Sequence, residues 1–243
     1  MRTTLFIADL HLSETTPAIT DCFLRFLETE ASQAEALYIL GDLFEYWVGD
    51  DDNSDYFWSI KQALKALVER GVYCAFINGN RDLLIGHRFE QQTGVKVLPQ
   101  ETLIDLYGRP TLLLHGDTLC IDDVAYQAYR AKVHNPRNQR IYYWLPLWLR
   151  RRLVAKIRAK SKQGKQQKSA EIMDVNEAEV ARVLRQYHMP LMIHGHTHRP
   201  AIHQIELDEQ TTQRIVLGDW YTQGSVLRVT EQGVALEQLA FKK

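Results

Sequence analysis

Short groups of side chains that can bind metal ions recur along the sequence, each directly after an apolar run. The five groups are Asp9-Leu10-His11, Gly41-Asp42, Gly79-Asn80-Arg81-Asp82, His115-Gly116-Asp117 and His194-Gly195-His196-Thr197-His198. Carboxylate, imidazole and amide-oxygen donors in one set favour Mn²⁺, Fe or Zn²⁺ over Ca²⁺. The number of donors indicates two metal ions, and two metals about 3.5–4 Å apart stabilise both the attacking and the leaving oxygen in phosphoryl transfer.

The apolar runs before these groups predict buried strands, which alternate with helices in the first half of the chain. Residues 4–9, 36–40 and 72–77 are expected strands, and residues 18–32 and 54–70 carry apolar side chains at helical spacing. Such alternation gives parallel strands, whose carboxyl ends lie at one edge of the sheet and bind ligands there. We therefore expect the five groups to converge on one rim.

Later apolar runs are short and have little helix between them, which is typical of antiparallel hairpins. They cover residues 102–107, 111–115, 191–194, 201–207, 214–217, 225–230 and 234–239. We predict an α/β fold, a sandwich of two sheets with outer helices. No Gly/Ser/Pro linker divides the 243 residues, so residues 1–243 are expected to form a single domain.

The composition is that of a globular protein. With 45% hydrophobic and 24% charged residues, the chain is not expected to be disordered, collagenous or a coiled coil. Three separated cysteines, Cys22, Cys74 and Cys120, indicate buried thiols in a reducing compartment. No export signal is expected at the N-terminus, and the longest nearly uncharged apolar stretch, residues 141–149, falls far short of the roughly 20 residues that span a bilayer.

The formal net charge of −1 hides an uneven distribution of charge. Residues 124–170 contain thirteen Lys or Arg and no Asp or Glu, which leaves 16 positive against 30 negative charges elsewhere. This asymmetry points to an anionic partner such as phosphate, nucleic acid or a membrane surface. We interpret residues 122–175 as a basic, aromatic helical insertion, the cap, placed beside the same rim.

The cap also contains an aromatic and apolar stretch, residues 141–149, directly before Arg150, Arg151 and Arg152. Aromatic side chains next to arginines fit a segment that lies on an anionic bilayer or covers an acyl chain. The alternative is that this stretch forms the core of the cap. A merely solvated basic face is disfavoured, because no acidic residue interrupts the 47 residues from 124 to 170.

In this order, the five groups resemble the motif set of the calcineurin-like, dinuclear metallophosphoesterases. The resemblance runs from Asp9 to His198 and implies the β-sandwich of that family, two mixed sheets flanked by helices, with a helical insertion cap. It implies one metal ion held by Asp9, His11, Asp42 and His198, and a second held by Asp42, Asn80, His115 and His196. The shared ligand, Asp42, would bridge the two ions.

One position departs from the general pattern of that family. Where many members have His in Gly-Asn-His-Asp, this chain has Arg81. Arginine does not deliver a proton at neutral pH, but its planar guanidinium can hold two phosphate oxygens and neutralise developing charge. The substitution favours diphosphate substrates, because a phosphate leaving group does not need protonation.

Nearly the whole chain resembles the UDP-2,3-diacylglucosamine hydrolases of Gram-negative lipid A synthesis. The motifs that carry this resemblance include Gly41-Asp42-Leu43-Phe44, Arg158-Ala159-Lys160-Ser161 and Lys168-Ser169. The resemblance implies hydrolysis of UDP-2,3-diacylglucosamine to 2,3-diacylglucosamine 1-phosphate and UMP. It also implies two metal ions, usually Mn²⁺, that activate a hydroxide to attack the α-phosphorus. It implies a peripheral enzyme on the anionic cytoplasmic face of the inner membrane, with no nucleic-acid partner; no protein partner is indicated. Catalysis is expected at Asp42, Asn80, Arg81 and His115, and substrate contacts at Asn80, Arg81, Asp123, Ser161, Lys165, Lys168 and His196.

Other functions remain open from the residues alone. A soluble nucleotide phosphodiesterase or dinucleoside polyphosphate hydrolase would use the same metal core. A nucleic-acid-binding protein would use the basic segment and show a steep salt dependence, whereas an inactive scaffold would have lost ligands.

Several further polar residues near the motifs are expected to have structural roles. We expect His194 to support the ligands or the fold rather than to bind a metal itself, and Asp82 and Asp117 to orient ligands. The run Asp50-Asp51-Asp52 lacks the spacing of an EF-hand and is expected to be a solvated loop.

Overall fold

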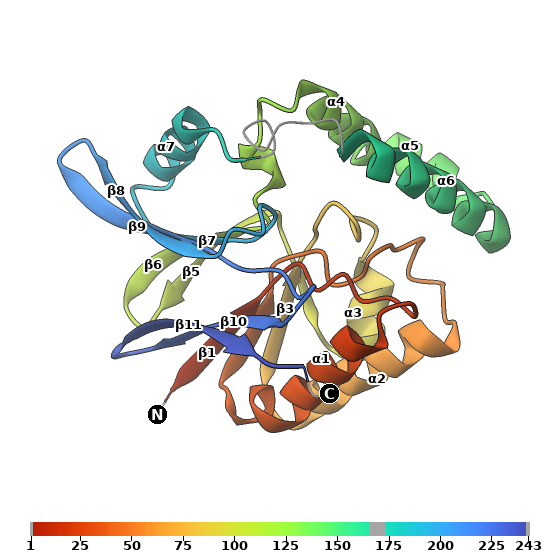
Figure 1. The fold of residues 1–243 in the computed structure, drawn as a ribbon, viewed down its shortest axis with the longest axis horizontal. Coiled ribbons are helices and arrows are strands. Elements are labelled where there is room, and N and C mark those ends of the chain that lie inside the picture. The colour runs from red at the N-terminus through yellow and green to blue at the C-terminus, as the bar shows by residue number, and fades with distance from the viewer. Residues whose placement is uncertain (1, 166–173, 242–243) are drawn as a thin grey trace.

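The computed structural model describes residues 2–165 and 174–241, with side chains for residues 2–159 and 174–241. Two β-sheets pack face to face, with helices on their outer faces and further helices across one end (Figure 1). The predicted α/β sandwich is confirmed.

The first sheet has six strands in the order β11-β10-β1-β2-β3-β4. Their bounds are β1 (Thr3–Ile7), β2 (Ala36–Ile39), β3 (Tyr73–Ile77), β4 (Lys96–Leu98), β10 (Gly224–Thr230) and β11 (Gly233–Leu239). The strands β1 to β4 are parallel neighbours, as the strand and helix alternation predicts, whereas β10 is antiparallel to both β1 and β11.

The second sheet has five strands in the order β5-β6-β7-β9-β8. Their bounds are β5 (Glu101–Leu106), β6 (Arg109–Leu114), β7 (Leu191–His194), β8 (Ala201–Leu207) and β9 (Gln210–Val216). The predicted hairpins are confirmed at β5-β6 and β8-β9, and at β10-β11 in the first sheet. The central strands β6, β7 and β9 are parallel, so this sheet also has a set of carboxyl ends on one side.

Helices cover the outer face of each sheet. The first sheet carries α1 (Pro17–Thr29), α2 (Asp55–Glu69) and α3 (His87–Thr93), and the second carries α7 (Glu177–Gln186). Along β1 the side chains alternate as a pleated strand requires: Leu5 and Ile7 pack under the helices, whereas Phe6 and Ala8 face the second sheet. Both faces of the first sheet are therefore buried, and the polar residues lie at the ends of its strands.

The sequence prediction lacks three elements. The helix α3 and the strand β4 are too short to give a periodic signal. The helix α7 does have the helical spacing, since Val180, Val183 and Leu184 are buried on one face, but the prediction does not include it. The strand β9 also starts at Gln210 rather than at the predicted residue 214, because its first residues are polar and exposed on the hairpin with β8.

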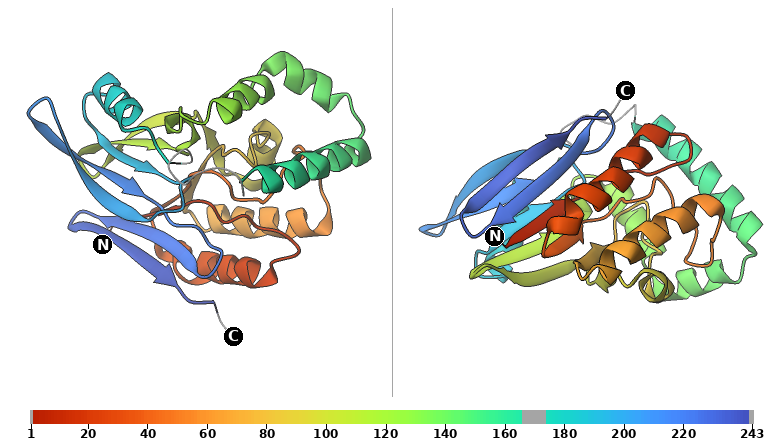
Figure 2. Two further views of the ribbon diagram at one scale, coloured as in Figure 1. Left: turned by 45° about the horizontal axis from the view of Figure 1, so that its top comes forward. Right: turned by 90° about the horizontal axis from the view of Figure 1, so that it is seen from below.

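The cap region forms three helices, α4 (Val124–Val133), α5 (Pro136–Tyr143) and α6 (Leu147–Lys165), which cross over one end of the sandwich (Figures 1 and 2). Neither α4 nor α5 has a fully buried residue. The side chains of Ile141 and Trp144 are 59% and 80% exposed, so these two residues of the aromatic stretch are not part of a core of the cap. No helix in the described ranges is long and apolar enough to cross a bilayer.

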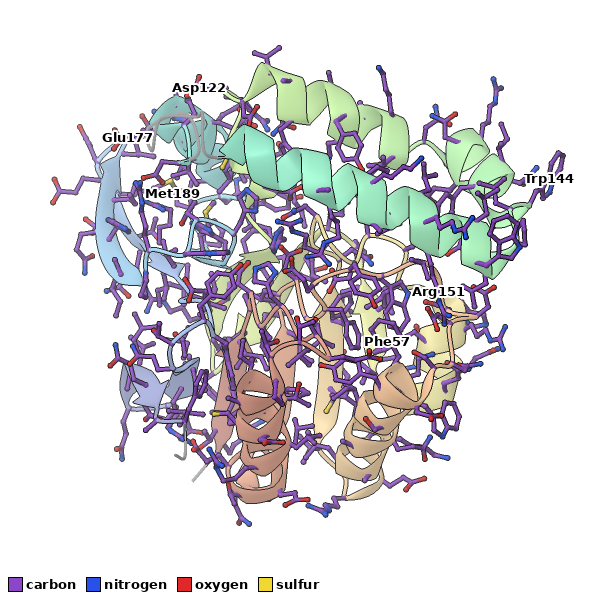
Figure 3. The ribbon with its side chains drawn as sticks, turned by 45° about the vertical axis from the view of Figure 1, so that its right-hand side comes forward. Phe57, Asp122, Trp144, Arg151, Glu177 and Met189 are labelled. Atoms are coloured by element: carbon purple, nitrogen blue, oxygen red, sulfur yellow. The ribbon has the colours of Figure 1, made fainter. Side chains whose placement is uncertain are left out.

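The cap is attached to the body through ion pairs with the loop between β2 and α2. Arg150 pairs with Asp51, and Nη2 of Arg151 lies 2.6 Å from Oδ1 of Asp52. Figure 3 shows Arg151 on the side of α6 that faces this loop. The expectation of a solvated loop for Asp50-Asp51-Asp52 is therefore wrong, because Asp50 and Asp52 are buried and all three carboxylates accept hydrogen bonds.

Candidate active site

Each group of metal-competent residues lies at the carboxyl end of a parallel strand. The groups follow β1 (Asp9, His11), β2 (Asp42), β3 (Asn80, Arg81, Asp82), β6 (His115, Asp117) and β7 (His194, His196, His198). Contacts cross between the two sheets here: the backbone N–H of His196 donates to Oδ2 of Asp9 over 2.8 Å, and His115 approaches Asp42. The structure therefore brings the predicted ligands together at one rim, beside the cap.

The backbone at this rim is strained. Positive φ angles occur at Asp9 (56°), His11 (51°), Asp42 (52°), His196 (71°) and His198 (57°). The left-handed region costs an ordinary residue roughly 1–2 kcal/mol, and such strain concentrates at functional sites. Beneath two of these residues, Gly79 and Gly195 pack so closely that a Cβ would overlap the carboxylates of Asp42 and Asp9.

One group of donors consists of Asp9, His11 and His198, whose ligand atoms all lie within 4.8 Å of one another. The Nε2 atoms of His11 and His198 are 3.5 Å apart, and Nε2 of His198 is 3.4 Å from Oδ1 of Asp9. That Asp9 oxygen is buried and receives no aligned hydrogen bond from the described residues. A cation between these atoms would satisfy all of them, which fits a metal site.

A second group gathers around Nε2 of His115. It lies 3.2 Å from Oδ1 of Asn80, 3.2 Å from Nδ1 of His196 and 3.8 Å from Oδ1 of Asp42. Asp9, Asp42 and His115 also form a set of possible ligands within 4.8 Å. Because the other oxygen of Asp42 lies 3.9 Å from Nε2 of His11, the Asp42 carboxylate faces both groups.

The electrostatics of the rim favour a bound cation. Burial lowers the pKa of both His11 and His196 to about 4, so these imidazoles are neutral near pH 7, the form that binds metals. Burial opposes the charged form of His115 as well, but Asp42 and Asp9 outweigh it and raise the His115 pKa to about 9. The two carboxylates thus favour a positive charge at His115, which a metal ion can supply in place of the proton on the His115 ring.

The whole chain also matches known proteins. Residues 2–200 match the model of the calcineurin-like phosphoesterase family. The chain belongs to this family. It is 54% identical over 233 residues to "UDP-2,3-diacylglucosamine hydrolase" of Salmonella paratyphi B, covering 96% of this chain and 97% of the relative, and equally so to the same-named protein of Salmonella enteritidis. A hypothetical protein from Pyrococcus horikoshii, 12% identical, shares the fold with a TM-score of 0.51 over 100% of this chain and 90% of its own.

Membership in the calcineurin-like phosphoesterases means that the chain uses divalent metal ions, and the resemblance to UDP-2,3-diacylglucosamine hydrolases is confirmed. Manganese in particular belongs to the proposal below. The donor set fits such ions, since it combines carboxylate, neutral imidazole and amide oxygens.

Two buried aspartates organise the loops of this phosphoesterase site. Asp82 accepts hydrogen bonds from the backbone N–H groups of Gly79, Asp42 and Leu43 at 2.9, 3.2 and 2.7 Å, which joins the loops after β2 and β3. Asp117 accepts from Tyr126 Oη at 2.6 Å and from Arg130 Nε at 2.7 Å, which joins the β6 loop to α4. Both therefore fix the shape of the loops that carry the predicted ligands, and their role in orienting those ligands stays a prediction.

His194 is fully buried and engaged on both ring nitrogens. Its Nδ1 lies 2.8 Å from the Gly195 carbonyl oxygen, and Arg214 donates to its Nε2 over 3.1 Å. Burial and the Arg214 charge lower the His194 pKa to about 3. The residue has the structural role expected from the sequence.

Three residues of the site do not follow from the motifs. Glu45 Oε2 lies 3.0 Å from Nδ1 of His11, and Asp219 Oδ2 lies 3.4 Å from Nδ1 of His198. The ring of Tyr221 stacks on His11, with 5.2 Å between centroids and 1° between planes. Asp219 could have been found by the rule that located the others, since it follows the apolar end of β9; Glu45 and Tyr221 give no such signal.

The predicted substrate contacts are only partly described. The backbone N–H of Arg81 donates to Oδ1 of Asp42 over 2.8 Å, and Nε of Arg81 is buried without a hydrogen-bond partner among the described residues. Asp123 caps α4 by accepting from the backbone N–H of Tyr126 at 3.0 Å. The side chains of Ser161 and Lys165, and the whole of Lys168, lie outside the described residues.

Proposed function

We propose that this chain hydrolyses the diphosphate bond of UDP-2,3-diacylglucosamine and releases 2,3-diacylglucosamine 1-phosphate and UMP in lipid A biosynthesis. The observation that carries the proposal is its 54% identity to proteins named for that activity, over 96% of the chain. The gathered rim of carboxylates and histidines supports it, because every predicted ligand is present and none points away from the group.

Two Mn²⁺ ions would complete the site. Asp9, His11, Asp42 and His198 would hold one ion, and Asp42, Asn80, His115 and His196 would hold the other. The assignment is supported by the separation of the two groups of donor atoms and by the position of Asp42 between them. When bound, the ions supply positive charge to the phosphoryl oxygens and lower the pKa of an attacking water.

The side chains of the chain itself position the diphosphate. The planar fork of Arg81 binds oxygens of the diphosphate and offsets charge that develops as the bond to the leaving phosphate breaks. Attack at the α-phosphorus leaves UMP as one product and the sugar phosphate as the other. Asn80 and His196 contact the same phosphates, since both lie beside His115 at the centre of the rim. The resemblance assigns further substrate contacts to Asp123, Ser161, Lys165 and Lys168, of which the structure describes the side chain of Asp123 alone.

The cap faces an anionic membrane surface, the cytoplasmic side of the inner membrane, from which the acylated substrate enters. Trp144 and Trp148 are 80% and 57% exposed, and Figure 3 shows Trp144 at the outer end of the cap, pointing away from the body. The guanidinium of Arg152 lies 5.3 Å from the centre of the Trp148 ring. Exposed indoles beside arginines suit the interface of an anionic bilayer.

The function is tested by comparing two substrates after the protein has been treated with a chelator and then supplied with Mn²⁺. UDP-2,3-diacylglucosamine in detergent micelles is expected to release UMP only when Mn²⁺ is present, whereas UDP-N-acetylglucosamine, which lacks the acyl chains, is expected to react far more slowly. Equal cleavage of both substrates would favour the soluble nucleotide hydrolase, and cleavage of neither would overturn the proposed substrate.

Membrane contact makes a separate prediction. The double substitution Trp144→Ser and Trp148→Ser is expected to lower binding to vesicles that contain anionic lipid by about tenfold, since two exposed indoles no longer enter the interface. Co-sedimentation with the vesicles measures this. Trp58→Ser is the matched control, because Trp58 is 42% exposed on α2, outside the cap. Unchanged sedimentation of the double variant would count against the membrane-facing orientation of the cap.

A further inference from the structure

Glu45 lies beside the metal-competent rim but belongs to none of the sequence motifs. It follows Asp42 by three residues, and its backbone N–H donates to the carbonyl oxygen of Leu12 over 3.0 Å. The neighbouring bonds from His11 N–H to Asp42 O at 3.0 Å and from Leu12 N–H to Leu43 O at 2.9 Å join the same two loops. Glu45 is therefore held at a fixed place relative to His11 by backbone contacts on both sides.

The His11 ring has two different surroundings. Its Nε2 faces the donors of the rim, 3.5 Å from Nε2 of His198 and 3.9 Å from Oδ2 of Asp42. Its Nδ1 faces outward to Oε2 of Glu45 at 3.0 Å, an ion-pair contact in which the oxygen lies off the direction of the ring N–H. A carboxylate on the outer nitrogen of a histidine sets the ring orientation and raises its basicity toward a metal.

The other oxygen of Glu45 contacts the cap. Oε1 of Glu45 pairs with the guanidinium of Arg158 on α6, and this guanidinium lies 5.3 Å from the centre of the Tyr46 ring. Glu45 is 23% exposed and Arg158 28% exposed, so water screens the pair only partly. A single carboxylate thus divides its two oxygens between a metal-competent histidine and a helix of the cap.

We propose that Glu45 is a positioning residue that couples docking of the cap to metal binding at the His11 site. When α6 is docked, Arg158 holds the Glu45 carboxylate against the outer nitrogen of His11, and the inner nitrogen is oriented for the ion. When α6 moves away, Glu45 loses this restraint and the metal is held less tightly. By reciprocity, a bound ion favours the docked cap. The inference rests on the metal centre of the proposed function, but it concerns the cap and not the substrate.

A second ion pair of the same helix provides the matched control. Arg151 pairs with Asp52 at 2.6 Å and so also ties α6 to the body. The contacts of Asp52 with the described residues include none of the metal-competent residues of the rim: its carboxylate oxygens accept from Arg151 and the backbone N–H of Ser54, and its backbone oxygen accepts from Lys61. Loss of Arg151 therefore loosens the helix without removing a contact to His11 through Glu45.

The test measures Mn²⁺ affinity and cap mobility on the full chain, with no substrate present. Titration calorimetry of the chelator-treated protein gives the affinity, and hydrogen exchange of the α6 amides reports docking. Glu45→Gln is expected to weaken Mn²⁺ binding at one of the two sites by about 10–100-fold and to speed exchange in α6. Arg158→Gln is expected to speed the same exchange and to weaken Mn²⁺ binding by a smaller factor.

Two comparisons decide the outcome. In the coupled arrangement, Arg151→Gln speeds exchange in α6 but weakens Mn²⁺ binding less than Arg158→Gln does, because the Glu45–Arg158 pair is still present. The double variant of Glu45→Gln and Arg158→Gln binds Mn²⁺ as weakly as Glu45→Gln alone, because both changes break one bridge. Wild-type affinity in Glu45→Gln, equal weakening in Arg151→Gln, or additive losses in the double variant would each overturn the inference. Since none of these readouts uses the lipid substrate, they are independent of whether the proposed function holds.

Discussion

Replacing Asp42 with asparagine is expected to lower kcat/KM for diphosphate hydrolysis at least about a thousandfold, which corresponds to about 4 kcal/mol of transition-state stabilisation. The two Asp42 oxygens face the two groups of donors, at 3.9 Å from Nε2 of His11 and 3.8 Å from Nε2 of His115. Asparagine keeps the shape and can still accept from the Arg81 backbone N–H, but it lacks the negative charge that would be shared between the two ions in the proposed site. Steady-state hydrolysis and Mn²⁺ stoichiometry measure the effect.

Asparagine at residue 42 separates the effect of losing the negative charge from an effect on folding. Asp42 has a φ of 52°, and asparagine tolerates this region better than alanine does. Asp208→Asn is the matched control, because Asp208 also has a positive φ of 51° but pairs with Arg185 at the β8-β9 turn. The control should keep full activity. Wild-type turnover and two bound ions in Asp42→Asn would show that the bridging assignment is wrong.

The rim was predictable because two independent patterns coincide at it. Apolar runs predict β1, β2 and β3, and the alternation with helices makes these strands parallel, so their carboxyl ends had to share an edge. Polar residues directly after each run then had to meet. The same rule locates His115 and His196 at the carboxyl ends of strands in the second sheet, although their closeness to Asp42 depends on how the two sheets pack.

The remaining parts of the site depend on contacts that no local pattern encodes. Glu45 gains its place from backbone bonds between two loops, and the acidic run at Asp51 and Asp52 is covered by a helix that begins nearly a hundred residues later. From local composition alone, such residues are expected to be charged and exposed to solvent. Only the packing of α6 against the body decides that they are ion-pair partners, so the docking of the cap could not be derived from the sequence.

The backbone strain at the rim has a similar explanation. A histidine with positive φ has an unfavourable local conformation, and single residues such as His11 and His198 give no sign of it in the sequence. The loops hold these angles because backbone bonds such as Asp9 N–H to Gly41 O at 3.1 Å over-determine them. Strain of this kind keeps several donors aimed at a common point before any ion binds, which lowers the reorganisation that metal binding requires.

Arg81→Lys is expected to reduce kcat about a hundredfold, or about 3 kcal/mol, with a smaller change in KM. Lysine keeps the charge but loses the planar fork that holds two phosphate oxygens at once. The backbone contact from Arg81 N–H to Asp42 survives any side-chain change, so the variant isolates the guanidinium. Arg2→Lys is the matched control: Arg2 makes a two-pronged pair with Glu35 far from the rim, and its loss should leave the rate unchanged.

Arg81→His separates charge stabilisation from proton donation. A histidine can give a proton to a poor leaving group, whereas arginine cannot. If Arg81 serves a leaving phosphate, Arg81→His should lose activity on the diphosphate, yet gain relative to wild type on a phosphodiester with an alkyl leaving group. Assaying both substrates across pH 5–9 tests this, because the gain should follow the protonated imidazole and fade as the pH rises. An unchanged ratio of the two activities would mean that residue 81 binds phosphate without selecting the leaving group.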